Sequence, residues 1–141
     1  MGPLDLSGLS NGATLLLDTA PIIYWLEDRA PFSRRFAPLF QLHAEGRIRF
    51  AVTTVTIAEV LIGPLQGGDD ALARRYRAVL ESWRVLDLNA GLAEDAARLR
   101  ARLRLKLPDA IQAASALSIN AEALVTHDRD FSRVSALRVL S

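Results

Sequence analysis

Residues 14–18, Thr-Leu-Leu-Leu-Asp, place three consecutive leucines directly before an aspartate. A short continuous apolar run of this kind is typical of a strand that is buried on both faces, as the strands of a parallel sheet are. Residues 49–52 (RFAV) and 123–126 (ALVT) have the same character, and residues 84–88 (RVLDL) and 137–140 (LRVL) are predicted to form two further strands.

Helical patterns separate these strands. Apolar residues recur at helical spacing in residues 20–27, 31–45, 56–65, 69–83 and 89–104, and a last helix is expected to begin at Pro108 and Asp109. Pro38 is expected to kink or split its helix, and Gly63-Pro64 to end the next one. Residues 98–107 also alternate as a strand would, but the helical residues before them favour a helix to about residue 104. The alternation predicts a three-layer α/β/α sandwich with a mainly parallel sheet of four or five strands.

The length of 141 residues fits one domain, which we place at residues 13–141, after a flexible lead-in at residues 1–12 that is rich in Gly, Ser, Pro and Asn. The chain has no cysteine, which fits a reducing compartment and excludes zinc sites built on thiolates. It has neither a secretory signal pattern nor an apolar run long enough to span a bilayer. We therefore expect a cytoplasmic protein without a membrane segment.

Four carboxylates are predicted to meet at one edge of the sheet. Asp18 directly follows the first strand, Asp128 comes two residues after residues 123–126, and Glu59 and Asp109 lie near helix starts. Ligand sites of parallel sheets lie beyond the carboxyl ends of the strands. Clustered anions favour a bound cation, and oxygen ligands suit Mg²⁺ or Mn²⁺, which can activate water to hydrolyse phosphodiesters. Each residue taken alone could instead be a helix cap, a turn former or a surface residue.

Four segments, in this order, resemble the PIN-domain family, and within it the VapC-type toxins of bacterial toxin–antitoxin pairs. They are LLLDTAPIIYWLE (15–27), TTVTIAEVLIG (53–63), LPDAIQAASAL (107–117) and ALVTHDRDF (123–131). Any one of these motifs is weak, but the ordered set is specific and covers the domain from about residue 14 to the end.

The resemblance implies a PIN-like fold and a catalytic metal site formed by Asp18, Glu59, Asp109 and Asp128. It further implies that Thr126 is a polar helper near the metal or its water. Asp130 would be a supporting or alternative ligand. It could equally form a turn with Arg129, and we prefer this second interpretation of Asp130. The expected function is an endoribonuclease that uses Mg²⁺ or Mn²⁺ and is the toxin of a type II pair. A homodimer, and inhibition by a small antitoxin whose tail enters the site, are implied as well.

One position departs from the family pattern. Many members have Asn or Ser two residues after the first aspartate, where this chain has Ala20. A hydrogen bond that could orient Asp18 or a metal-bound water is therefore expected to be missing. The same alanine argues against a phosphatase with an aspartate nucleophile, which would need a second aspartate there.

The net charge is only +1, but removing the four proposed site carboxylates leaves +1 + 4 = +5 for the rest of the chain. The densest basic run contains Arg98, Arg100, Arg102 and Arg104, which are candidates for contacts with the RNA backbone. The alternative is a solvated helix face that pairs with Glu94 and Asp95. Two other functions stay open, namely a non-catalytic RNA- or protein-binding module and a housekeeping RNA-processing nuclease. Neither His43 nor His127 is expected to act as a base.

Overall fold

The computed structural model describes residues 2–141. Its sheet has five strands, β1 (Ala13–Leu17), β2 (Ile48–Thr53), β3 (Arg84–Leu86), β4 (Ala123–Val125) and β5 (Val139–Leu140). Neighbouring strands are parallel throughout, in the order β3-β2-β1-β4-β5. The predicted parallel sheet is confirmed, and the last strand is shorter than residues 137–140.

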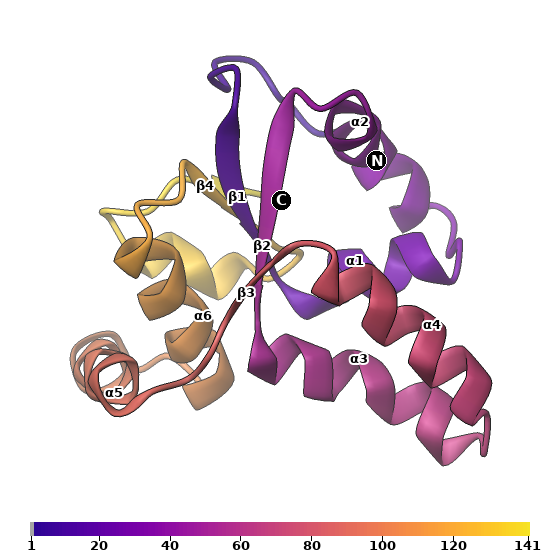
Figure 1. Ribbon diagram of the computed structural model, residues 1–141. Coiled ribbons are helices and arrows are strands. Elements are labelled where there is room, and N and C mark those ends of the chain that lie inside the picture. The colour runs from indigo at the N-terminus through magenta and orange to yellow at the C-terminus, as the bar shows by residue number, and fades with distance from the viewer. Residues whose placement is uncertain (1) are drawn as a thin grey trace.

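Helices cover both faces of this sheet (Figure 1). One layer contains α1 (Thr19–Leu26), α2 (Phe32–Ala44), α3 (Thr54–Gln66) and α4 (Asp70–Glu81), and the other contains α5 (Ala90–Leu103) and α6 (Leu107–Ser118). Successive leucines of β1 divide between the two cores, because side chains alternate along a strand. Leu15 and Leu17 pack with Ile22 and Phe36, whereas Leu16 packs on the α5–α6 side with Ala51. The three-layer sandwich is confirmed.

Two prolines were expected to disturb helices. The prediction that Gly63-Pro64 ends α3 is wrong, since α3 continues to Gln66 and is closed by Gly67. Pro64 lies in the last turn, where its missing N–H removes a single hydrogen bond. Pro38 lies inside α2, which nevertheless forms one helix from Phe32 to Ala44.

The ambiguous basic stretch is helical to Leu103, as favoured. Arg104 then takes a left-handed conformation with φ 57°, which ends α5. Leu105 is fully buried in the core beneath α5 and α6. The strand-like alternation after Leu103 therefore reflects a short extended link that buries one side chain.

Residue 1 of the predicted lead-in lies outside the described residues. Residues 2–12 have no helix or strand, but they lie against the domain rather than apart from it. Leu4 is buried in the main core, and its backbone N–H donates to the carbonyl of Arg35. The Ser10 N–H donates to the Glu122 carboxylate at 2.7 Å. Within the part of the chain that the structure describes, no helix combines the length and apolarity needed to cross a membrane.

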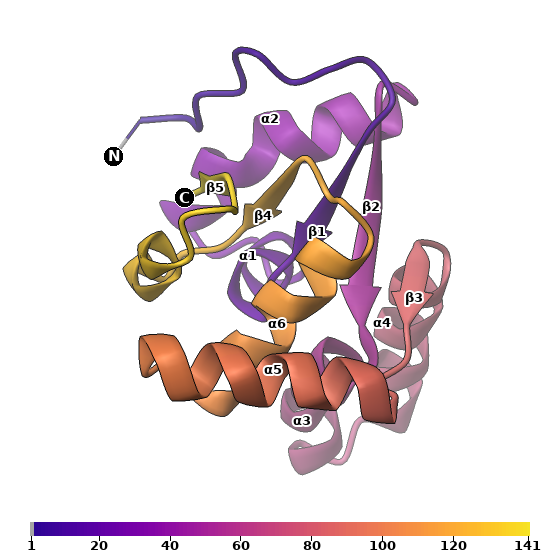
Figure 2. The same cartoon turned by 90° about the vertical axis from the view of Figure 1, so that its left-hand side faces the viewer.

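The order of the strands creates a crevice beside β1. The chain winds from β1 to β2 and β3 on one side, then crosses to place β4 and β5 on the other side, so that β1 lies between β2 and β4 (Figure 2). Such a reversal of direction separates the loops at the carboxyl ends of adjacent strands, and ligands bind in the space between them. Asp18 follows β1 at this position.

Candidate active site

A cleft of about 580 Å³ lies at this crevice and collects all four carboxylates that the sequence singled out. Its acidic lining consists of Asp18 after β1, Glu59 from α3, Asp109 from α6 and Asp128 after β4. Segments separated by more than one hundred residues thus contribute to one site. We predicted from the strand ends and helix starts that these four side chains converge, and the structure places them on one cleft.

Two of these carboxylates form a tighter group with a further one, Asp130. Asp109, Asp128 and Asp130 each offer an oxygen within 4.8 Å of the others. Asp128 precedes η1 (Arg129–Arg133), a short 3-10 helix, and its Oδ1 accepts from the Asp130 N–H at 2.8 Å. This turn brings Asp130 back towards Asp128, although Asp130 also lies 3.6 Å from the Arg133 guanidinium. Asp130 therefore lies in a turn with Arg129, as preferred, and it also belongs to the acidic group.

Asp109 is the least satisfied of these groups. It lies in the first turn of α6, but Lys106 is the N-cap residue, so the carboxylate does not cap the helix. Its Oδ2 is buried and has no hydrogen-bond partner among the described residues. Burial is the main reason that the pKa of Asp109 is raised to about 6, and the carboxylates of Asp128 and Asp18 raise it further. A buried oxygen without a donor, next to other anions, is unfavourable unless a cation or proton is present.

Asp18 is held in one orientation. It caps α1, and its Oδ1 accepts from the Thr19 backbone N–H at 2.9 Å and from the Gln112 amide at 3.1 Å. Its Oδ2 accepts from the Thr126 hydroxyl at 2.8 Å. The Thr126 oxygen in turn accepts from the Asp128 N–H at 3.0 Å. Thr126, which is fully buried, therefore connects Asp18 to the loop that carries Asp128, and its role as a polar helper stays a prediction.

Glu59 lies in the second turn of α3, not the first, because α3 begins at Thr54. Its Oε1 accepts from the Thr19 hydroxyl at 2.9 Å. The Glu59 side chain is half-buried, and Ile62 and Leu65 further along α3 are half-exposed.

The donor set fits a divalent cation. The acidic group consists of carboxylates alone, and no histidine or cysteine belongs to it in the described residues. Hard oxygen ligands suit Mg²⁺ and Mn²⁺. The buried, unpaired Oδ2 of Asp109 is an independent sign that this group accommodates a cation. Asp109, Asp128 and Asp130 are the side chains placed to hold one, with Asp18 and Glu59 on the same cleft.

Several other residues of the cleft could hardly be identified from sequence patterns. Tyr24 and His127 line it, and their rings meet edge to face with centroids 5.8 Å apart. His127, which was not expected to act as a base, forms part of the wall together with Asp128. Arg129 also lines the cleft and places a cation beside the acids. His43, as expected, lies elsewhere and stacks on Phe50 with ring centroids 4.2 Å apart.

The basic run of α5 lies outside this cleft. Arg98 pairs with Glu94 at 3.0 Å, and Arg100 donates to the Leu105 carbonyl at 2.7 Å. Arg104 ends the helix. The predicted pairing with Glu94 is thus confirmed for Arg98, while contact of these arginines with RNA stays a prediction.

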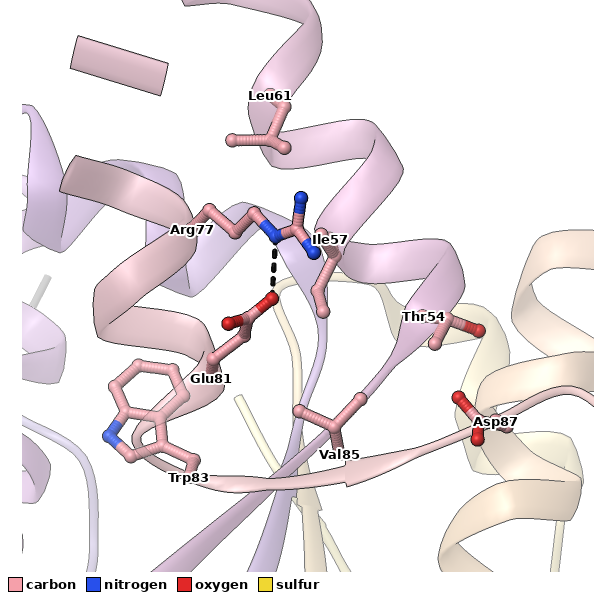
Figure 3. Close-up of a pocket in the computed structure, with 8 residues that line it drawn as sticks. All are labelled: Thr54, Ile57, Leu61, Arg77, Glu81, Trp83, Val85 and Asp87. Atoms are coloured by element: carbon pink, nitrogen blue, oxygen red, sulfur yellow. Dashed lines mark hydrogen bonds and ion pairs between the residues drawn. The ribbon is translucent and has the colours of Figure 1, made fainter. Parts of the chain in front are cut away.

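A second hollow, of about 500 Å³, lies between α3, α4 and β3 (Figure 3). Ile57 and Leu61 of α3 enter it from one side, and Trp83 and Val85 line it below (Figure 3). Arg77 and Glu81, one turn apart on α4, form an ion pair at 2.5 Å on one side of it. The lining is therefore part apolar and part charged.

Comparison with known proteins places the fold. The chain matches the PIN domain family model over residues 15–137. It is similar to a toxin–antitoxin complex from Klebsiella pneumoniae, with 24% identity and a TM-score of 0.71 over 90% of this chain and 96% of that chain. It is also similar to the sarcin–ricin loop cleaving toxin VapC20 of Mycobacterium tuberculosis, with 17% identity and a TM-score of 0.69 over 90% and 99% of the two chains.

A third solved structure, the toxin–antitoxin system VapBC-5 of Mycobacterium tuberculosis, shares 28% identity with a TM-score of 0.57, over 90% of this chain and 95% of that chain. No curated protein matches the chain. The family match spans most of the sequence and includes every carboxylate of the cleft. The chain therefore belongs to the PIN domain family.

Proposed function

We propose that this protein is an endoribonuclease that depends on Mg²⁺ or Mn²⁺ and hydrolyses RNA phosphodiesters at the acidic cleft. The observation that carries the proposal is the group formed by Asp109, Asp128 and Asp130, with the buried, unpaired Oδ2 of Asp109 at its base. Membership of the PIN domain family supports the nuclease class.

Each part of the site has a distinct task in this proposal. Asp18, Glu59, Asp109 and Asp128, with Asp130 beside them, would hold one or two metal ions, which when bound supply a Lewis acid and a more acidic water. Asp18, fixed by three hydrogen bonds, and Glu59 keep the remaining side of the cleft negative and rigid. Arg129 offers the positive charge that attracts a phosphate to an otherwise acidic site.

The test is cleavage of a panel of structured and single-stranded RNAs with Mg²⁺ or Mn²⁺ by wild type, Asp18→Asn and Asp109→Asn. We expect cleavage that needs metal and falls at least about 100-fold in both variants. Asp95→Asn is the matched control, because Asp95 is an exposed aspartate of α5 outside the acidic cleft.

Each outcome has a clear meaning. Activity that survives in both variants would contradict the site assignment. A folded wild type that binds Mn²⁺ but cleaves none of these RNAs would favour the non-catalytic RNA- or protein-binding alternative.

We further propose that the protein is the cytoplasmic toxin of a type II toxin–antitoxin pair, acts as a homodimer and is inhibited by a small antitoxin. The similar structures from Klebsiella pneumoniae and Mycobacterium tuberculosis, which are toxin–antitoxin systems, support this role. The hollow of Figure 3 and the half-exposed Ile62 and Leu65 on the same helix supply apolar surface for a partner.

The partner is tested in cells that express this protein with or without any small reading frame found next to its gene. We expect growth arrest without that frame, rescue with it, and copurification of the two products. Ile62→Asp together with Leu65→Asp should weaken copurification while RNA cleavage persists. Harmless expression of an active nuclease would instead favour a housekeeping RNA-processing role.

Arg98, Arg100, Arg102 and Arg104 are proposed, more weakly, as contacts to the RNA backbone. The ion pair of Arg98 and the carbonyl contact of Arg100 give both a structural role already. Arg102 has no hydrogen bond or ion pair within residues 2–141, and is the member of the run that is most available for a phosphate.

A further inference from the structure

We propose that Gln112 is a positioning residue that orients the Asp18 carboxylate, and so replaces the hydrogen bond that Ala20 cannot supply. The inference rests on the proposed function, because it concerns the same cleft. Gln112 lies in α6, one turn after Asp109, and its side chain is only 1% exposed. It does not line the cleft, so it acts through Asp18 and not on a substrate.

The three polar contacts of Gln112 fix the orientation of its amide. Nε2 donates to Asp18 Oδ1 at 3.1 Å and to Thr56 Oγ1 at 2.7 Å, while Oε1 accepts from Thr53 Oγ1 at 2.9 Å. An amide nitrogen has two N–H donors, and both are used. The amide thus connects the end of β1, the end of β2 and the first turn of α3.

These contacts extend to the second carboxylate of the cleft. Thr56 Oγ1 lies 3.3 Å from Thr19 Oγ1, and the Thr19 hydroxyl donates to Glu59 at 2.9 Å. A chain of hydrogen bonds therefore runs from Asp18 through Gln112, Thr56 and Thr19 to Glu59. Gln112 and Thr56 are almost completely buried, so water does not compete for these bonds.

The donors around Asp18 show why Gln112 matters. An ionised carboxylate has about four lone-pair sites. The Thr19 N–H and Gln112 occupy Oδ1, and Thr126 occupies one position on Oδ2. This arrangement leaves Oδ2 with about one free lone pair and prevents rotation of the carboxylate. Without Gln112, one of its two side-chain donors is lost and the carboxylate can turn.

The alternative is that Gln112 only provides hydrogen-bond partners for the buried hydroxyls of Thr53 and Thr56 and has no effect on the cleft. The two roles differ in what a substitution changes. A purely structural role predicts lower stability with unchanged metal binding and turnover. A positioning role predicts weaker metal binding and slower turnover in protein that is still folded, because partners of ligating groups typically contribute 10–100-fold to metal affinity or activity.

The experiment compares wild type with Gln112→Met, which removes the donor, and Gln112→Glu, which keeps the shape but places an acceptor against Asp18. Ser115→Ala is the matched control, because Ser115 is fully buried one turn later in α6 and bonds only the Ile111 carbonyl. The readouts are Mn²⁺ titration by calorimetry, kcat and KM for RNA, and crystal structures that show the Asp18 side chain.

We expect both Gln112 variants to bind Mn²⁺ about 10-fold more weakly or worse, and to lose kcat about 10–100-fold with little change in KM. Asp18 should rotate or occupy more than one orientation, whereas the Ser115 variant should match wild type in all three readouts. Wild-type Mn²⁺ affinity, kcat and Asp18 orientation in both Gln112 variants would overturn the proposal. If wild type cleaves no RNA, the proposed function fails on its own, and Mn²⁺ affinity and the Asp18 orientation still decide the role of Gln112.

Discussion

At the scale of single residues, Asp109 links the stability of the protein to pH. Its pKa is raised from 3.8 to about 6, mainly by burial and then by neighbouring carboxylates. The folded protein therefore holds this proton more tightly than the unfolded chain does. The contribution of this bound proton to the free energy of unfolding is fully present below about pH 4 and is lost as the pH rises through about 6.

Replacing Asp109 by Asn should remove this dependence. In metal-free buffer with a chelator, we expect Asp109→Asn to be more stable than wild type at pH 7.5 by about 1 kcal/mol, after allowance for solvent screening of a partly exposed group. The difference should shrink towards pH 5. Urea unfolding of both proteins at the two pH values measures this directly. A wild type that is the more stable of the two at pH 7.5 would contradict the prediction.

The predictability of the site also varies from residue to residue. Asp18, Asp109 and Asp128 could be found from sequence because each one adjoins a strand end or a helix start, and these positions converge in a parallel sheet. Gln112 could not be found in this way. It lies within residues 110–116 of α6, all of them buried, and helical periodicity does not tell which of these faces the end of β1.

At the scale of elements, the cap of α5 is an isolated interaction that can be measured. The Asn89 side chain accepts from the Leu92 N–H at 2.9 Å and begins the helix, as predicted. Loss of an N-cap typically costs about 1 kcal/mol. We expect Asn89→Ala to lower the free energy of unfolding by about that amount without changing RNA cleavage per folded molecule.

The matched variant for this cap is Asp69→Ala, since the Asp69 side chain caps α4 with a bond of 3.0 Å to the Leu72 N–H. A similar loss of stability in both variants would confirm that capping is responsible. Loss of cleavage in Asn89→Ala at full folding would show instead that α5 is coupled to the cleft.

The elements themselves were largely predictable, and the errors have local causes. Alternating strand and helix patterns identify every strand, because buried parallel strands leave short apolar runs. The predicted helix end at Gly63-Pro64 was wrong because a proline in the last turn of a helix costs little stability. The sequence does not show which turn is the last one. The residues around Leu105 have a strand-like sequence pattern because they form a short link that buries one side chain between two helices.

At the scale of the whole molecule, metal binding should stabilise the fold as well as the cleft. The acidic group is built from α6 and the segment after β4, so a bound ion joins separate elements. At 100 times its Kd a ligand contributes about 2.7 kcal/mol. We expect saturating Mn²⁺ to raise the Tm of wild type by roughly 5–10 °C in thermal unfolding.

Asp109→Asn should lose most of this rise, whereas Asp95→Asn should keep it. An equal rise in all three proteins would place the ion elsewhere.

The crevice itself was predictable at this scale, because a parallel sheet with helices on both faces places its loops together at one edge. Surfaces for a partner were not predictable, because the apolar pattern of residues 56–65 does not show that Ile62 and Leu65 are half-exposed.

The order of the acidic residues along the chain has a consequence for the cell that makes the protein. Asp109, Asp128 and Asp130 all follow residue 106, so they leave the ribosome after most of the chain has been made. A nascent chain that ends before α5 carries only Asp18 and Glu59 of the cleft carboxylates. Under the proposed activity, such a chain cannot cleave its own messenger. Under the same proposal, the order of translation delays RNA cleavage until the second half of the chain has emerged.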